Sequence, residues 1–211
     1  MMSYPFNKDG IYSLMIAFLC ILALLSAGCS SKGNFVPFQE RMGIIRDYDL
    51  LKKGGDIDWF YASNNAIEPG ESLYVPDFVF IGNDDYELYD NELRRINLKK
   101  TAGDFVSNAL KEKGIFSHVD RQTSSYPSEA KYVLAGAVIC LEGCHTQFFV
   151  DNPVNENVRF SLEMELIDSD ERTTLFTAKH TFSLKSSDHD VILSGLKSAV
   201  NRIAGEIARR P

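Results

Sequence analysis

Two cysteines and a histidine stand close together in this sequence, and their chemistry is the most specific that the chain offers. Cys140, Cys144 and His145 belong to the run CLEGCH. Residues four apart in an extended strand are separated by roughly 13 Å, whereas the Cα atoms of a disulfide lie about 4.4 to 6.8 Å apart. A disulfide between Cys140 and Cys144 therefore requires a turn, which Gly143 makes possible. Outside the cytoplasm we expect this pair to be oxidised.

The same run has two alternative interpretations. It resembles a widened form of the c-type haem attachment motif, which normally has two residues between its cysteines. Cys140, Cys144 and His145 could instead bind a metal ion, although no second pair of ligands stands at a spacing typical of zinc sites. The disulfide is the interpretation that we favour, so we expect no cofactor and no metal.

A further cysteine, Cys29, follows a leader-like segment. Residues 11–25 are apolar except for Ser13, and as a helix they would span roughly 22 Å, less than the hydrocarbon core of about 30 Å. A short apolar run that ends in small residues, here Ser26 to Gly28, is typical of a signal peptide. These residues with Cys29 resemble the bacterial lipobox, in which the cysteine receives diacylglycerol before cleavage. The resemblance implies a lipoprotein signal peptide over residues 1–28.

The same resemblance implies where the mature protein is held. Cys29 would be its lipidated first residue, carrying palmitate or similar chains, and residues 29–34 would form a tether. Ser30 follows the cysteine, and by the sorting rule of enteric bacteria a residue other than Asp directs a lipoprotein to the outer membrane. We therefore expect a lipid-anchored protein of the outer membrane that faces the periplasm.

Charge and motif content exclude several classes of function. The chain has 22 basic and 29 acidic residues, a net charge of −7, so we expect no nucleic-acid partner. The other three histidines are scattered: His118 lies in a loop, His180 lies on an apolar strand face, and His189 lies at a helix start. There is no G-x-S-x-G, H-E-x-x-H or P-loop motif. We therefore expect no catalytic residues and a protein that is not an enzyme.

An aromatic pair is the remaining candidate site. Phe148 and Phe149 lie between two predicted strands, in the run QFFV. Exposed aromatic side chains often mark docking surfaces, so we interpret this pair as partner-binding. The alternative is that both rings extend a hairpin and pack in the core.

Hydrophobic periodicity predicts the elements that must position these residues. The strands cover 72–81, 132–140, 158–166 and 176–184, and the helices cover 98–113 and a final segment with its apolar stripe from Ile192 to Ile207. Pro76 cannot donate to a strand ladder, so the first strand should lie at an edge or carry a bulge. The strand 158–166 alternates large apolar residues with polar ones, which predicts one face in contact with solvent.

The order β-α-β-β-β-α predicts an α/β (α+β) fold. We expect a two-layer sandwich with a mixed sheet of about four strands and both helices on one face. The helical crossover should join parallel strands, and the last two strands should form a hairpin. Residues 72–211 would form this α/β domain, and residues 35–71 an irregular strap packed on it, with a short strand at 57–61.

The leader and the order of elements resemble small bacterial envelope lipoproteins. The segment 130–142 (AKYVLAGAVICLE), with the hairpin and terminal helix that follow, resembles the second half of such domains. The run 44–51 (IIRDYDLL) is similar to the start of an uncharacterised lipoprotein family. Among the similar groups are ABC-type transport auxiliary lipoproteins, the lipoprotein plug of the lipopolysaccharide translocon and lipoprotein activators of penicillin-binding proteins. The chain departs from the transport auxiliaries because its only tryptophan, Trp59, lies in the strap.

These families act mainly by binding, so the resemblance implies a non-enzymatic accessory or docking subunit of a cell-envelope complex, in transport, assembly or secretion. The alternative is a binding module for lipid or cell-wall polymer. A third hypothesis is a redox or metal protein that uses Cys140, Cys144 and His145. The sequence makes no prediction of the oligomeric state.

Overall fold

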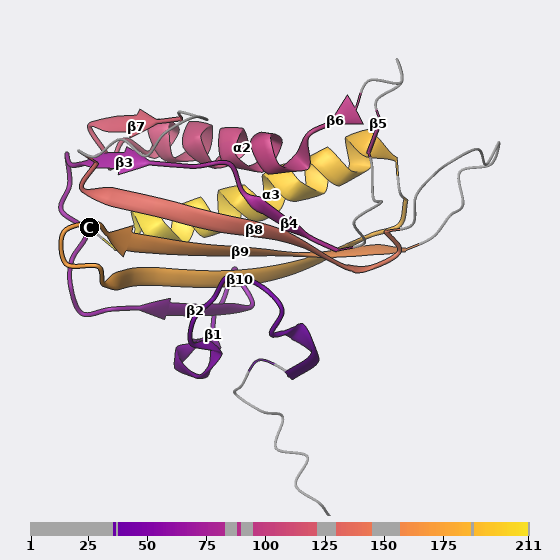
Figure 1. Ribbon diagram of the computed structural model, residues 1–211, viewed down its shortest axis with the longest axis horizontal. Coiled ribbons are helices and arrows are strands. Elements are labelled where there is room, and N and C mark those ends of the chain that lie inside the picture. The colour runs from indigo at the N-terminus through magenta and orange to yellow at the C-terminus, as the bar shows by residue number, and fades with distance from the viewer. Residues whose placement is uncertain are drawn as a thin grey trace, which may run out of the picture. The chain divides into compact units, whose positions relative to one another are not determined.

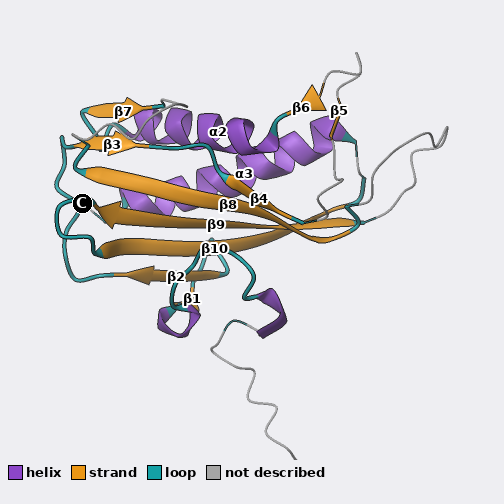
Figure 2. Ribbon diagram, viewed as in Figure 1, coloured by secondary structure: helices purple, strands orange, loops and turns teal. Residues whose placement is uncertain are grey.

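The computed structural model describes residues 36, 38–82, 88–89, 95–121, 130–144, 157–186 and 188–210. The chain divides into two compact units, Met1–Asn34 and Phe35–Pro211. All the described residues belong to the second unit, whose elements are shown in Figures 1 and 2.

Eight strands form one mixed sheet within the described residues. Their order is β1-β2-β10-β9-β8-β3-β7, and β4 pairs with β8. The strands are β1 (Lys52–Lys53), β2 (Trp59–Ala62), β3 (Ser72–Tyr74), β4 (Val79–Ile81), β7 (His118–Asp120), β8 (Tyr132–Glu142), β9 (Val158–Asp168) and β10 (Thr174–Leu184), while β5 (Leu88–Tyr89) and β6 (Arg95–Ile96) form a separate pair. The predicted α+β class is confirmed, but the prediction of about four strands understates the sheet.

The three long strands are those with the strongest sequence patterns. β9 and β10 form the predicted antiparallel hairpin, and β9 also pairs with β8. Both β3 and β4 run parallel to β8, as a helical crossover requires. Residues 75–78, which contain Pro76, separate β3 from β4. The predicted strand 72–81 is therefore two short strands, because proline interrupts the ladder.

Both predicted helices are confirmed. In α2 (Leu98–Lys113) the Asn97 side chain accepts a hydrogen bond from the backbone N–H of Lys100, and Gly114 ends the helix with φ 66°. In α3 (His189–Ala208) the Asp188 side chain caps the first turn. Of the described helices, none is both long and apolar enough to span a membrane.

The apolar stripes of α2 and α3 cover one face of the sheet (Figure 2). Alternate residues of β9 and β10 point to this face, among them Phe160, Leu162 and Ala178, and all three are buried. We call it the helix face. It contains the larger of two apolar clusters, which brings the described elements of the unit together around one core.

The central part of the opposite face of β9 and β10 is buried rather than exposed to solvent, and here the sequence-based expectation was wrong. Ser161, Glu163 and Glu165 are 0%, 0% and 4% exposed. Residues 36 and 38–51, which we call the covering segment, cross this face with two single-turn helices, η1 (Phe38–Glu40) and η2 (Tyr48–Leu50). Figure 1 shows this indigo segment beyond β10 and β2, away from α2 and α3. The alternation therefore gives the side of each residue correctly, but a distant part of the chain excludes the water.

A second apolar cluster lies under the covering segment. It consists of Val36, Ile45, Leu51 and Trp59, with Tyr48 and Tyr61 packed against it. Trp59 belongs to β2, where it lies opposite Lys179 of β10. The strap expected at 35–71 thus contributes β1 and β2 to the sheet, and its first part covers the sheet's second face.

Candidate functional site

A buried cluster of polar side chains lies between the covering segment and the sheet. Lys179 Nζ donates hydrogen bonds to Glu163 Oε1 at 3.2 Å, to Ser161 Oγ at 2.9 Å and to the carbonyl oxygen of Glu40 at 2.9 Å. The side chains of Lys179 and Glu163 are 0% exposed. The hairpin positions this ion pair, because Lys179 and Glu163 are directly opposed in the β9–β10 register.

The covering segment completes this buried polar cluster from the other side. Tyr48 Oη donates to the Glu163 carboxylate, at 2.9 and 3.0 Å from its two oxygens, and accepts a hydrogen bond from the N–H of Gly43 at 2.8 Å. Burial, with the charge of Glu163 beside it, holds the pKa of Tyr48 well above its usual value. A Cβ atom at Gly43 would overlap the Glu163 carboxylate, so the close approach requires glycine.

A second carboxylate on the same face is held by the backbone of the covering segment. The N–H of Arg46 donates to Glu165 Oε1 at 3.2 Å. Burial raises the pKa of the Glu165 carboxyl, and the Arg46 hydrogen bond only partly opposes that shift. Glu163 and Glu165 thus attach the covering segment to β9 at two successive positions of one face.

Ser161 and Lys179 have the residue types of a nucleophile and its base, but their arrangement does not support catalysis. A lysine acts as a base only through the lone pair of its neutral amine. The ammonium of Lys179 instead donates all three of its hydrogens, to Glu163, Ser161 and Glu40. Ser161 is also 0% exposed. The geometry suits a connection between two parts of the fold rather than a reaction with a substrate.

The predicted cysteine pair is brought to disulfide distance. The Cα atoms of Cys140 and Cys144 lie 6.2 Å apart, within the range that a disulfide requires. Gly143 makes the expected turn with φ 76°, a backbone conformation that residues with a side chain rarely adopt. His145 lies outside the described residues, so the haem and metal alternatives stay as predictions of the sequence.

We expect Cys140 and Cys144 to be oxidised in protein isolated from the cell envelope, because their Cα distance permits the bond and the expected compartment is oxidising. A mass spectrum of the unreduced peptide should show two hydrogens fewer than that of the reduced peptide. Reduction and alkylation of the same sample is the control. Two thiols that titrate fully before reduction would contradict the prediction.

Two histidines, His180 and His189, lie within ion-pair distance of aspartates. His180 is 8% exposed, and its Nδ1 lies 3.6 Å from Asp58 Oδ1. Asp58 Oδ2 accepts from the N–H of Thr181 at 2.7 Å. Burial alone would raise the pKa of Asp58, but the neighbouring His180 and the hydrogen bond from the Thr181 N–H outweigh burial and lower that pKa. The contacts join β10 to the loop before β2.

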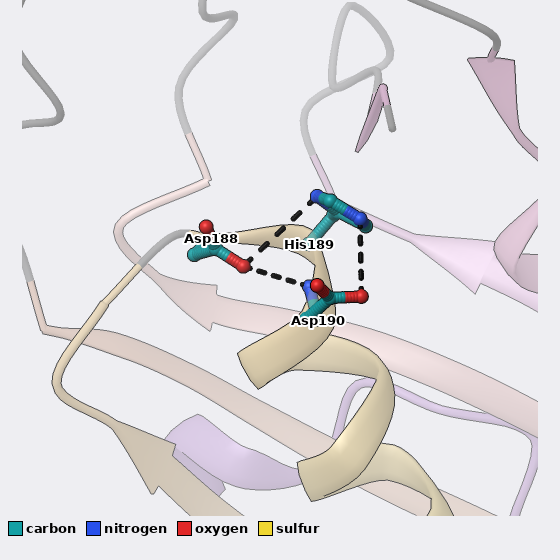
Figure 3. Close-up of side chains that lie close together, drawn as sticks. All are labelled: Asp188, His189 and Asp190. Carbon is teal, nitrogen blue, oxygen red and sulfur yellow. Dashed lines mark hydrogen bonds and ion pairs between the residues drawn. The ribbon is translucent and has the colours of Figure 1, made fainter. Parts of the chain in front are cut away.

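The other aspartate-bound histidine is His189, at the start of α3 (Figure 3). Its Nε2 lies 3.1 Å from Asp190 Oδ1, and Asp188 Oδ1 accepts from the N–H of Asp190 at 2.9 Å. Within the described ranges this is the only group of three side chains close enough to hold a cation. Helix capping by the Asp188 side chain accounts for its contact without a metal.

An open groove runs along the outer sides of α2 and α3. It consists of two adjoining hollows of about 630 and about 380 Å³, which share Lys197 and Asn201. The first hollow is lined by Asp56, Lys113, Ser194, Lys197, Ser198, Asn201, Arg202, Gly205 and Arg209, and the second adds Phe105, Asn108, Ala109, Lys111 and Glu112. Five cations against two carboxylates make this helix groove positive, although the chain as a whole is negative.

The structure thus describes only some of the candidate site residues that the sequence predicted. Cys140 and Cys144 come together, whereas Cys29, His145, Phe148 and Phe149 lie outside the described residues. Sequence reasoning missed the buried polar cluster. Its one local signal was that Lys179 and Glu163 lie on the same face of a predicted hairpin. Cross-strand pairs of opposite charge also occur on faces that contact solvent, so this signal does not predict burial.

The sequence matches no family model, and no curated protein matches it either. Solved structures of similar fold include a PelC dodecamer from Paraburkholderia phytofirmans, with a TM-score of 0.46 and 17% identity over 69% of this chain and 94% of that one. A Xanthomonas campestris protein described as DUF330 has a TM-score of 0.42 and 14% identity over 70% of this chain and 86% of that one. Lipoprotein GNA1162 from Neisseria meningitidis has a TM-score of 0.36 and 18% identity over 64% of this chain and 99% of that one. The structural neighbours therefore include a protein described as a bacterial lipoprotein.

Proposed function

We propose that this protein is a lipid-anchored, non-enzymatic accessory subunit of a cell-envelope complex, held at the outer membrane and facing the periplasm. The observation that carries the proposal is the place where the chain enters the folded unit. Val36 is 1% exposed and packs in the apolar cluster under the covering segment. It follows Cys29 by seven residues, which span at most about 25 Å when fully extended.

This short connection would orient the domain. A lipid on Cys29 would keep the covered face of the sheet near the membrane, because the chain enters on that face. The outer surface of α2 and α3, with the positive groove, would be turned away from the membrane and presented to partners. The buried polar cluster supports such a role, because it fixes the covering segment to the sheet, so that the anchor and the domain would move together.

The segment from Glu142 to Glu156, between β8 and β9, is the docking element that we propose. It contains Phe148 and Phe149, which lie outside the described residues. A disulfide between Cys140 and Cys144, where this segment begins, would restrict the chain before binding, which lowers the ordering cost of association. The two phenylalanines would then act as anchors in a partner's pocket.

The double substitution Phe148→Ala with Phe149→Ala tests this element. Anchoring aromatics at an interface typically cost about 2 kcal/mol or more when truncated, so recovery of a membrane partner should fall sharply while the melting temperature stays unchanged. Partner recovery and melting temperature are measured on the same preparation. Phe160→Ala is the control for a core ring, since Phe160 is 1% exposed, and such truncations cost about 3 to 5 kcal/mol in stability. A double mutant that melts as early as this control would refute the docking role.

The alternative function, a module that binds lipid or cell-wall polymer, is favoured by one observation. Within the described residues, Lys113 and Lys197 of the helix groove make no ion pair, so their charges are available to an anionic chain or headgroup. Mass spectrometry of the protein purified from membranes would show a stoichiometric lipid or glycan if this alternative is correct. A Soret band or bound metal in the same sample would instead favour the redox or metal protein.

A further inference from the structure

We propose that the covered side of the sheet is itself a membrane-contacting surface, on which Met42, Leu50 and Val79 rest against phospholipid. The inference deepens the proposed function and rests on lipidation of Cys29. It assigns a second, non-covalent attachment to the membrane, made by the folded domain.

Large apolar side chains are exposed mainly on this side of the molecule. In the described part of the chain four of them are exposed: Met42 is 54% exposed, Val79 50%, Leu50 49% and Val191 38%. Met42 and Leu50 belong to the covering segment. Val79 of β4 lies opposite Ala137 of β8, which lies opposite Glu163, so Val79 points to the covered face as well. Only Val191, on α3, belongs to the helix layer.

Met42 and Leu50 lie in two turns that contact each other. Arg41, next to Met42, makes an ion pair of 2.7 Å with Asp49, next to Leu50. The N–H of Gly43 donates to Tyr48 Oη at 2.8 Å. Because Tyr48 also binds the buried Glu163, both turns are fixed to the sheet. The exposed side chains therefore form part of an ordered surface rather than of a loose tail.

The membrane is the occupant that fits this surface best. The chain arrives here only seven residues after Cys29, so a lipid anchor would hold the surface within about 25 Å of the bilayer. A tether this short gives the surface a high effective concentration at the bilayer, so even a weak contact with lipid is populated. Apolar side chains beside cations suit the boundary between acyl chains and phosphate headgroups, and exposed Arg46 and Lys53 supply the cations. Lys53 lies opposite Trp59, so it also points to the covered face.

Tryptophan quenching in vesicles tests the proposal with the complete lipidated protein. The protein, first checked by mass spectrometry for lipid on Cys29, is reconstituted in vesicles of phosphatidylethanolamine and phosphatidylglycerol with brominated acyl chains. Leu50→Trp places a reporter on the covered side, and Val191→Trp is the matched control on the helix layer. The native Trp59 stays in both variants, so its signal is common to them.

Apolar side chains at a membrane interface lie about 5–10 Å into the boundary between headgroups and acyl chains. Brominated acyl chains should therefore quench the added emission of Leu50→Trp. The Val191→Trp emission should stay unchanged. Equal quenching of the two reporters, or none at Leu50→Trp, would overturn the membrane contact and leave this surface to a protein partner. Absence of lipid on Cys29 would instead overturn the proposed function, and the inference with it.

Discussion

Replacing Lys179 with methionine should lower the free energy of unfolding by about 3 to 5 kcal/mol, the usual cost of removing one partner of a buried ion pair. Methionine fills a similar volume but removes the ammonium that neutralises Glu163, and both side chains are fully buried. Ser161 Oγ and the Glu40 carbonyl would also lose their donor. Urea denaturation at neutral pH, followed by the fluorescence of Trp59, measures the effect.

Two controls separate the loss of the buried ion pair from other effects of changing lysine to methionine. Lys185→Met changes an exposed lysine beyond the end of β10 and should alter stability by about 0.5 kcal/mol or less. Lys179→Met combined with Glu163→Gln removes the uncompensated charge and should recover part of the lost stability. A loss below about 1 kcal/mol in the single variant would mean that the covering segment does not depend on this pair.

Replacing Cys29 with serine should abolish incorporation of labelled palmitate into the protein. Serine has no thiol for the thioether to diacylglycerol, and all the acyl chains of a lipoprotein depend on that step. Each buried methylene group contributes about 0.8 kcal/mol to membrane attachment, so several chains make it effectively permanent. Metabolic labelling of cells, with gel separation of the captured protein, measures the change directly.

Cys20→Ser is the matched control for this experiment. Cys20 lies within the apolar run of the leader and is not preceded by the small residues that precede Cys29. Its replacement should leave palmitate labelling as in the native protein. Undiminished labelling of the Cys29→Ser variant would contradict the assignment of a lipoprotein, and the membrane-side orientation of the domain would lose its basis.

The sequence determined those elements whose signal is local and repeated. The apolar stripe from Ile192 to Ile207 predicts α3, and the structure shows that Asp188 caps its first turn. The alternation in β9 and β10 predicts the hairpin and the face on which each side chain lies. These predictions succeed because helix and strand periods are fixed by backbone geometry and appear within a dozen residues.

The same reasoning finds the short strand β2 near residues 57–61 but does not find β1 or β7. β1 has two residues and β7 has three, too few to show a period. Such strands form because a neighbouring strand supplies hydrogen-bond partners, as β2 does for β1 and β3 does for β7. The full width of the sheet is therefore a property of the assembled fold.

Only the tertiary structure determined that the polar face of β9 is buried. An alternating pattern with Ser161, Glu163 and Glu165 reads in the sequence as a surface in water, and the strap was expected to pack on the domain without a known place. The hydrogen bond from Tyr48 to Glu163 joins residues 115 positions apart, and nothing local in either segment encodes it. Burial of a charge depends on which distant groups exclude the water and replace its hydrogen bonds, so Lys179 and Glu163 became an internal ion pair only when the covering segment closed over them.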